Sequence, residues 1–189
     1  DIRQVTADQV GDIDLLVGGS PCQGFSFAGK HLNFDDPRSK LFFEYVRLLK
    51  ELKPKYFLLE NVRMAQQSQD VISEHLGVEP IPINSNLVSA QNRYRLYWTN
   101  IPFTVPEDKG IVLTDIVEDG MVDRDKSHCL DANYFKGGNL KSYFEKHRRQ
   151  LVFNKASYRK LTPVECERLQ TVPDNYTNHV SNTQRYKML

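Results

Sequence analysis

Short apolar runs alternate with an amphipathic stretch in the N-terminal half of the sequence, and this alternation restricts the fold more than any other feature. Four runs have the length and composition of buried strands: 13–17, 55–62, 78–84 and 92–101. After the first run, apolar side chains recur at helical spacing, with Asp36 as the predicted N-cap and Pro37 in the first turn. A second helical stretch, 71–77, follows the next strand. This order is typical of α/β proteins, and we expect a doubly wound, Rossmann-like sheet.

The pattern weakens in the second half of the sequence, which indicates a different kind of module. We expect a first domain at 1–105, followed by a small module of irregular or β structure at 106–158. Helical signals return after it, because Thr162 and Glu165 have the spacing of a capping box. We therefore expect 159–189 to lead back to the first domain.

Charge is unevenly distributed along the chain, although the formal net charge is only +1. Between Asp123 and Lys160 there are ten Lys or Arg residues against four Asp or Glu, with six aromatic residues among them. This composition is typical of a nucleic-acid-binding surface. A solvated basic face has the same composition, so charge alone leaves both interpretations open.

Cysteine usage and hydropathy narrow the class of protein. The three cysteines are odd in number and form no C-x-x-C pair, so neither a disulfide framework nor a zinc cluster is predicted. A reducing compartment is expected. No apolar run approaches the roughly 20 residues that a membrane helix requires. We expect a cytoplasmic protein with no resident metal.

Reactive side chains follow two of the predicted strands. Cys22 comes after the first strand in "GGSPCQG", and Glu60 ends the second in "FLLENV". Sites in doubly wound sheets lie beyond the carboxyl ends of strands, so the pair suggests a nucleophile and an acid at one pocket. Taken singly, an inert buried thiol and an ordinary carboxylate are the simpler interpretations.

The segment "QNRYRLYW" supplies a third candidate element. Strand alternation places Gln91, Arg93 and Arg95 on one face of this segment. The other face, which we expect to be packed, carries Tyr94, Leu96 and Trp98. Two arginines on one face can hold an anion or favour a nearby thiolate, and a solvated edge strand is the alternative.

Four segments in this order resemble the cytosine-C5 DNA methyltransferase family, and especially its branch of phage and animal de novo enzymes. They are "GGSPCQGFS", "ENV", "QNRYR" and "YRKLTPVECERLQTVPDNY". The resemblance implies that a cytosine is flipped out of duplex DNA and methylated at C5, with the module at 106–158 recognising the target.

The resemblance also implies roles around the flipped base. Cys22 is expected to add to C6 as a thiolate, and a protonated Glu60 to contact N3. Arg95 is expected to contact the cytosine carbonyl oxygen, and Arg93 to orient the loop or the thiolate. The backbone carbonyl of Ser20 is expected to accept a hydrogen bond from the cytosine amino group.

Further substrate contacts are implied at five positions. Ser26 is a candidate phosphate contact, and Asn61 is expected to brace the strand end beside the substrate. Gln91 belongs to the same candidate set. Arg148 and Arg149 are expected to bind DNA from the basic module.

The resemblance names S-adenosylmethionine as the cofactor, with Asp1 and Pro21 as candidate contacts. The family's glycine-rich cofactor loop and its final Gly-Asn segment have no counterpart here. We therefore expect a fragment that is inactive alone, whether cut by choice or naturally split. Its exposed sheet edge is expected to favour self-association.

Two other functions remain open at this point. A tRNA cytosine-C5 methyltransferase has the same scaffold, although the basic, aromatic module argues against it. A catalytically incomplete paralogue that only binds DNA or a regulatory partner is the other. A bacterial or phage-infected cell is the expected setting.

Overall fold

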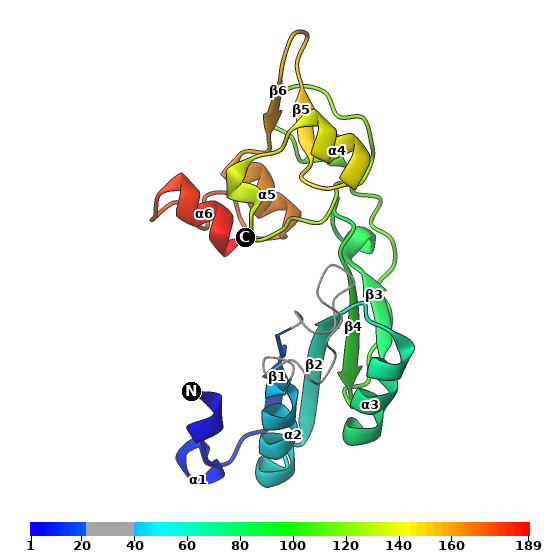
Figure 1. Cartoon of the computed structure of the whole chain (residues 1–189), viewed down its shortest axis with the longest axis vertical. Coiled ribbons are helices and arrows are strands. Elements are labelled where there is room, and N and C mark those ends of the chain that lie inside the picture. The colour runs from blue at the N-terminus through cyan, green and yellow to red at the C-terminus, as the bar shows by residue number, and fades with distance from the viewer. Residues whose placement is uncertain (22–39) are drawn as a thin grey trace. The chain divides into compact units, whose positions relative to one another are not determined.

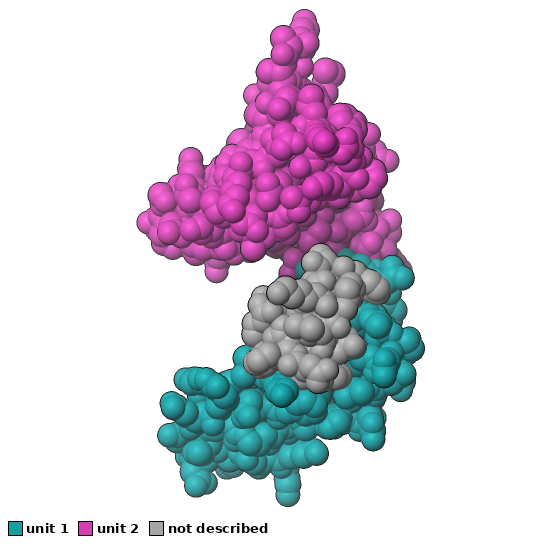
Figure 2. Space-filling view, in the orientation of Figure 1, with its two compact units in different colours: residues 1–83, 94–105 teal, residues 84–93, 106–189 magenta. Residues whose placement is uncertain are grey.

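The computed structural model describes residues 1–21 and 40–189. They form two compact units (Figure 2), of which unit 1 comprises residues 1–83 and 94–105, and unit 2 comprises residues 84–93 and 106–189. Cys22, Ser26, Asp36 and Pro37 lie outside the described residues. Among the described residues, no helix combines the length and the apolar character needed to cross a membrane.

Unit 1 is built on a four-stranded sheet with the order β1-β2-β4-β3 (Figure 1). Its strands are β1 (Leu15–Gly18), β2 (Tyr56–Val62), β3 (Ile81–Asn84) and β4 (Tyr94–Thr99). Its helices are η1 (Ile2–Gln4), α1 (Ala7–Val10), α2 (Leu41–Leu52) and α3 (Gln66–Leu76). The sheet is mixed, because β1 is parallel to β2 and β4 is antiparallel to it.

One face of this sheet forms the core of unit 1. Phe57 and Leu59 of β2 and Leu96 and Trp98 of β4 are buried on it. These side chains pack with buried residues of both α2 and α3: Phe42, Tyr45, Val46, Ile72 and Leu76. The helices thus lie on the same face.

The predicted helix and strand order is confirmed, and the mixed α/β class with it. The doubly wound arrangement needs helices on both faces, and in residues 1–21 and 40–105 both long helices cover one face only. Helix α2 ends at Leu52, where Lys53 turns into a left-handed conformation at φ 45° before Pro54. Helix α3 starts before the predicted stretch and ends at Gly77 with φ 71°.

Unit 2 contains short elements separated by long loops. Its 3-10 helices are η3 (Ser85–Leu87), η4 (Leu113–Asp115) and η5 (Tyr134–Lys136). Its other elements are α4 (Leu140–Lys146), β5 (Leu151–Phe153), β6 (Tyr158–Lys160), α5 (Pro163–Leu169) and α6 (Asn182–Met188). Strands β5 and β6 form an antiparallel hairpin. The expectation of an irregular module with some β structure agrees with these elements.

The C-terminal segment packs in unit 2. Cys166 and Leu169 of α5 and Tyr186 of α6 share one core with Leu113, Tyr134 and Val152. Residues 159–189 belong to unit 2, because helices α5 and α6 bury their apolar faces there. Thr162, Pro163 and Glu165 do form the predicted helix start, with the capping box in place.

Candidate functional site

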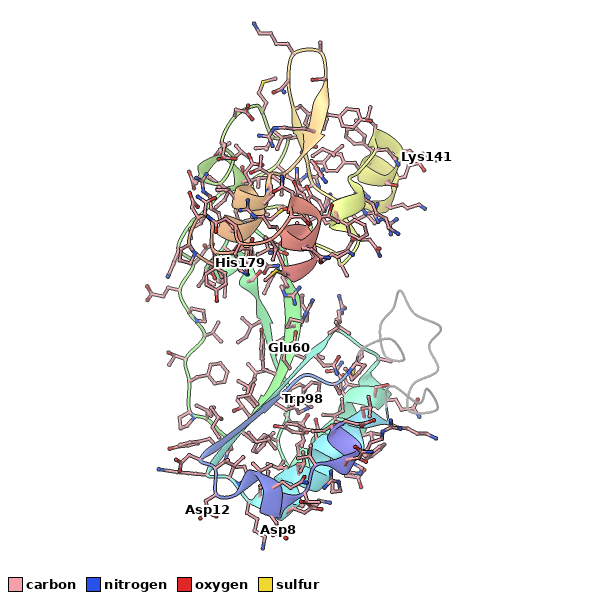
Figure 3. All side chains as sticks on the ribbon, turned by 90° about the vertical axis from the view of Figure 1, so that its left-hand side faces the viewer. Asp8, Asp12, Glu60, Trp98, Lys141 and His179 are labelled. Atoms are coloured by element: carbon pink, nitrogen blue, oxygen red, sulfur yellow. The ribbon has the colours of Figure 1, made fainter. Side chains whose placement is uncertain are left out.

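Glu60 and Arg95 form an ion pair on the face of the sheet opposite the core. Residues directly opposite in an antiparallel pair share a face, and Glu60 pairs with Tyr97 while Val62 pairs with Arg95. Arg95 is thus the diagonal neighbour of Glu60, within reach of a long side chain. Its Nε lies 2.7 Å from Glu60 Oε1, with the carboxylate 34% exposed and the guanidinium 16%. The structure brings these two predicted residues together, and Figure 3 labels Glu60 of this pair.

The glycines that precede the predicted nucleophile have different functions. A Cβ on Gly18 would lie 2.5 Å from Cδ2 of Tyr45. Only glycine therefore lets the Tyr45 ring, on α2, pack against the end of β1. A Cβ on Gly19 would lie 3.5 Å from Oε2 of Glu60, which is an ordinary contact. Close packing, and not a left-handed backbone, therefore requires Gly18. The chain that leads to Cys22 runs beside the Glu60 carboxylate.

Asn61 holds this chain in place. It is 1% exposed on the core face, where an unpaired amide would be costly. Its Nδ2 donates to Ser20 Oγ at 3.1 Å and to Ser20 O at 3.4 Å, and its Oδ1 accepts from the Val62 amide at 2.8 Å. Asn61 thus holds Ser20 beside the end of β2.

A largely apolar cavity of about 290 Å³ adjoins the same segment. Its lining includes Leu16, Gly18, Pro21, Tyr45 and Leu48. Pro21 therefore lies at a cavity wall. Asp1, the other candidate cofactor contact, pairs with the guanidinium of Arg3 and accepts from its amide at 3.0 Å.

Arg93 and Gln91 are not placed as strand alternation predicts, because β4 begins only at Tyr94. Gln91 is 1% exposed, donates to Leu169 O at 3.4 Å and accepts from the Leu130 amide at 2.9 Å. Arg93 contacts Cys129 Sγ at 3.7 Å and lines a cavity of about 270 Å³ in unit 2. Both residues belong to unit 2 and bind other groups of that unit.

Tyr94 is also placed differently from the prediction. It is 41% exposed instead of packed, and the guanidinium of Arg63 lies 5.8 Å from its ring centroid. Leu96 and Trp98 are buried as predicted.

Several of the cations counted in the basic region are engaged within unit 2. Arg149 donates to Gly137 O at 2.9 Å and pairs with Asp131 at 3.3 Å, and its side chain is 15% exposed. Lys126 donates to three carbonyls, and Arg159 and Lys160 also bind groups of unit 2. Arg148 is exposed. The expected DNA contact of Arg148 is compatible with its placement, whereas Nε and Nη1 of Arg149 already bind Asp131 and Gly137.

One cluster of interacting side chains in unit 2 was not predicted from the sequence. Arg124 binds Asp123 with both Nε and Nη2 at 3.1 Å, donates to His128 Nε2 at 2.6 Å, and lies 4.8 Å above the ring of Tyr143. Gln150, which is buried, donates to the Tyr143 hydroxyl at 2.8 Å. Burial, followed by the charges of Arg124 and His147, lowers the pKa of His128 to about 4. Only the adjacency of Asp123 and Arg124 was visible in the sequence.

The part of the chain that the structure describes contains no candidate metal-binding site. Residues 1–21 and 40–189 contain no group of three or more His, Cys, Asp or Glu side chains arranged to hold an ion.

Comparison with known proteins decides the family. The sequence model for C-5 cytosine-specific DNA methylase matches residues 1–77 and 83–189. The chain belongs to this family. It is 31% identical to the type II methyltransferase M1.ScrFI of Lactococcus lactis subsp. cremoris, over 99% of this chain and 60% of that protein.

Two further relatives of this chain come from a bacterium and a phage. The chain is 30% identical to the type II methyltransferase M.HpaII of Haemophilus parainfluenzae, over 92% of this chain and 66% of that protein. It is 39% identical to the orphan methyltransferase M.SPRI of Bacillus phage SPR, over 51% of this chain and 25% of that protein. The chain spans 60% of the length of M1.ScrFI.

In this family member, the four resembling segments are distributed over both units. Glu60 and Arg95 lie in unit 1, and Thr162 begins a helix of unit 2. Cys22 lies between the described ranges, so its assignment rests on the sequence.

Proposed function

We propose that the protein transfers a methyl group from S-adenosylmethionine to C5 of cytosine in double-stranded DNA. The Glu60–Arg95 pair carries this proposal, because it lies beside Gly19 on the chain that leads to Cys22. An acid and a guanidinium next to a thiol are the groups that activation of a pyrimidine ring requires.

The reaction begins at C6 of the flipped base. The Cys22 thiolate forms a bond to C6, and the electron pair of the C5–C6 bond becomes available at C5. Glu60 donates a proton or hydrogen bond to N3, which makes C6 more electrophilic. S-adenosylmethionine, when bound, would supply the electrophilic methyl group that C5 takes up, with the sulfur of the cofactor as the leaving group. Loss of the C5 proton to water, departure of the thiolate from C6 and return of the N3 proton to Glu60 then restore the aromatic ring.

The ion pair gives Arg95 and Glu60 linked functions. Without substrate, the carboxylate is balanced by the guanidinium at 2.7 Å. We propose that a bound cytosine separates the two groups, so that Arg95 binds its carbonyl oxygen and Glu60 takes up a proton. Ser20, held by Asn61, presents its carbonyl to the cytosine amino group.

The cavity beside Pro21 fits the apolar part of the cofactor. It is lined mainly by aliphatic side chains and the ring of Tyr45, which suits a flat heteroaromatic group. Pro21 would contact this group. Asp1 already pairs with Arg3, so it would bind the cofactor only after that pair separates.

Unit 2 is the proposed DNA-recognition module, and unit 1 the methyltransferase sheet of Rossmann-like type. The description of the matching family, C-5 cytosine-specific DNA methylase, favours DNA over tRNA as the substrate. We place the reaction in the cytoplasm of a bacterial or phage-infected cell, where such DNA is accessible. Strand β1 lies at the edge of the sheet described here, with Leu15 47% and Val17 61% exposed, and we propose that this edge pairs with another strand.

Methyl transfer from labelled cofactor to duplex DNA or to tRNA tests the proposal. We expect label in DNA only, and its loss in Cys22→Ser with DNA binding retained. Glu60→Gln should lower the rate by about 100-fold or more, because the proton donor at N3 is lost. Glu74→Gln on α3 is the matched control and should leave the rate unchanged. Label in tRNA alone, or a covalent adduct of Cys22→Ser with 5-fluorocytosine DNA, would contradict the proposal.

A further inference from the structure

Three apolar side chains form a row across the small sheet of unit 2. Phe153 of β5 pairs with Tyr158 of β6 on one side and with Met121 through an isolated antiparallel bridge on the other. Directly opposite residues point to the same face, so the three side chains are neighbours. Met121 is 61% and Tyr158 42% exposed. We call these three residues the Phe153 row.

The Phe153 row lies on the face turned away from the core of unit 2. Val152, the neighbour of Phe153 on β5, points to the opposite face, is fully buried and belongs to that core. In residues 84–93 and 106–189, the ring that contacts Phe153 is Tyr143 of α4, with centroids 5.8 Å apart. The exposed side chains of the row therefore do not serve the packing of unit 2.

Tyr143 also connects this row to a cation with a fixed orientation. The guanidinium of Arg124 stacks on the Tyr143 ring at 4.8 Å, and Asp123 and His128 hold its edges. The Tyr143 hydroxyl donates to Asp123 in turn. A planar guanidinium held on three sides loses little side-chain entropy on binding a ligand.

The charges around the row favour a polyanion. Three cations are exposed: Lys155 at the hairpin tip, Lys146 at the end of α4 and Arg148 shortly after this helix. Asp123 is paired with Arg124, and Asp119, in the segment just before Met121, is paired with Arg159. An apolar row with cations at its borders and paired carboxylates matches the bases and the phosphates of a nucleic-acid groove.

We propose that the Phe153 row and Arg124 contact base edges in a groove of duplex DNA, while Lys155 and Arg148 contact phosphates. This inference rests on the proposed function and identifies the base-reading side chains of unit 2. Apolar side chains contact thymine methyl groups, and an oriented guanidinium donates to the acceptor edge of guanine. Asp123 and His128 are positioning residues for Arg124.

The two kinds of contact are separated by their salt dependence. The probe is a duplex selected by the protein itself from a random pool. Met121→Ala with Tyr158→Ala should weaken binding about 10-fold or more without changing the salt slope, since no phosphate contact is lost. Lys155→Ala and Arg148→Ala should each reduce the slope by about one unit. Arg124→Lys and His128→Ala should reduce discrimination between selected and random duplexes.

Matched variants guard against a simple loss of folding. Met121→Leu with Tyr158→Phe keeps the apolar area and should bind like the wild type, and Phe103→Ala in unit 1 removes an equally exposed aromatic ring. Photo-crosslinking of the unmodified protein to 5-iodouracil duplex should label 121 or 151–160. Unchanged affinity in the alanine pair, or labelling only elsewhere, overturns the inference. Base contacts by these residues without any methyl transfer would support it and contradict the proposed reaction alone.

Discussion

Units 1 and 2 bury polar side chains in different ways. Among the described residues of unit 1, the buried polar ones are uncharged: Asn61, Ser68 and Ser73. Unit 2 buries three charged residues, Glu165, Glu167 and Arg185, besides Gln91 and Gln150. The strands of unit 2 have three residues each, too few for a sheet to order the chain, whereas β2 has seven. Where the backbone ladder is short, side-chain carboxylates take over its function.

Glu165 and Glu167 show how this works in unit 2. Glu165 caps α5 through the Thr162 amide, accepts from the Glu118 amide at 2.8 Å and binds Arg159 at 2.8 Å. Glu167 accepts from the amides of Asn175 and Thr177 and from Arg185 at 2.7–2.9 Å. Each carboxylate fixes loops that carry no regular structure. The fold of unit 2 therefore depends on individual side chains more than the fold of unit 1 does.

The largest expected effect comes from removing one of these charges. Glu167→Gln should destabilise unit 2 by about 3–5 kcal/mol, because it leaves Arg185 buried without its counterion. Hydrogen exchange in α5 and α6 measures this loss. Trp98, the only tryptophan, is buried in unit 1, and its fluorescence should report an unchanged local environment at low denaturant. Equal loss of hydrogen-exchange protection in units 1 and 2 would contradict the expected difference between them.

Low pH should remove the stabilisation that the Glu167 carboxylate provides. Although burial opposes it, hydrogen bonds from Thr177, Arg185 and Asn175 lower the pKa of Glu167 from 4.5 to about 2. The unfolded chain thus takes up this proton first, so the stabilisation is complete above pH 4.5 and is lost as pH falls toward 2. Wild type and Glu167→Gln should converge in stability over this range.

A steric test in unit 1 should give a smaller effect. Gly18→Ala should cost about 1–3 kcal/mol, because its Cβ overlaps the ring of Tyr45 at 2.5 Å. Gly19→Ala is the matched control and should cost under about 0.5 kcal/mol of packing energy, since its nearest atom lies 3.5 Å away. Denaturation followed by Trp98 fluorescence measures both. Equal costs would show that backbone freedom, and not the Tyr45 contact, is the requirement at these glycines.

The smallest effect is expected at His128. Its pKa is lowered from 6.5 to about 4, first by burial and then by Arg124 and His147. The unfolded chain is protonated first, so stability falls as pH drops from 6.5 toward 4. After allowance for solvent screening we expect about 1 kcal/mol. His128→Gln should abolish this part of the pH dependence in unit 2, and an unchanged profile would assign it to another group.

The sequence was most informative where periodicity governs the structure. Leu96 and Trp98 are buried as alternation predicts, and the capping box at Thr162 and Glu165 is present. Alternation failed at Gln91 because it assumed a strand where an irregular segment runs. Counting cations could not reveal the contacts of Arg149, whose partners Asp131 and Gly137 come from distant positions in the chain. Long-range side-chain contacts of this kind leave no local pattern.

The alternation of β2 restricts the mutations that the segment Glu60-Asn61-Val62 can accept during evolution. Glu60 and Val62 share one face, where Val62 sets the register with Arg95, and Asn61 points to the other face and holds Ser20. Deleting or inserting one residue at this end of the strand would turn the amide toward the arginine and the carboxylate into the core. Substitutions on either side of this segment keep the alternation, whereas an insertion or deletion within it does not. The spacing of these three residues is therefore expected to stay unchanged during evolution.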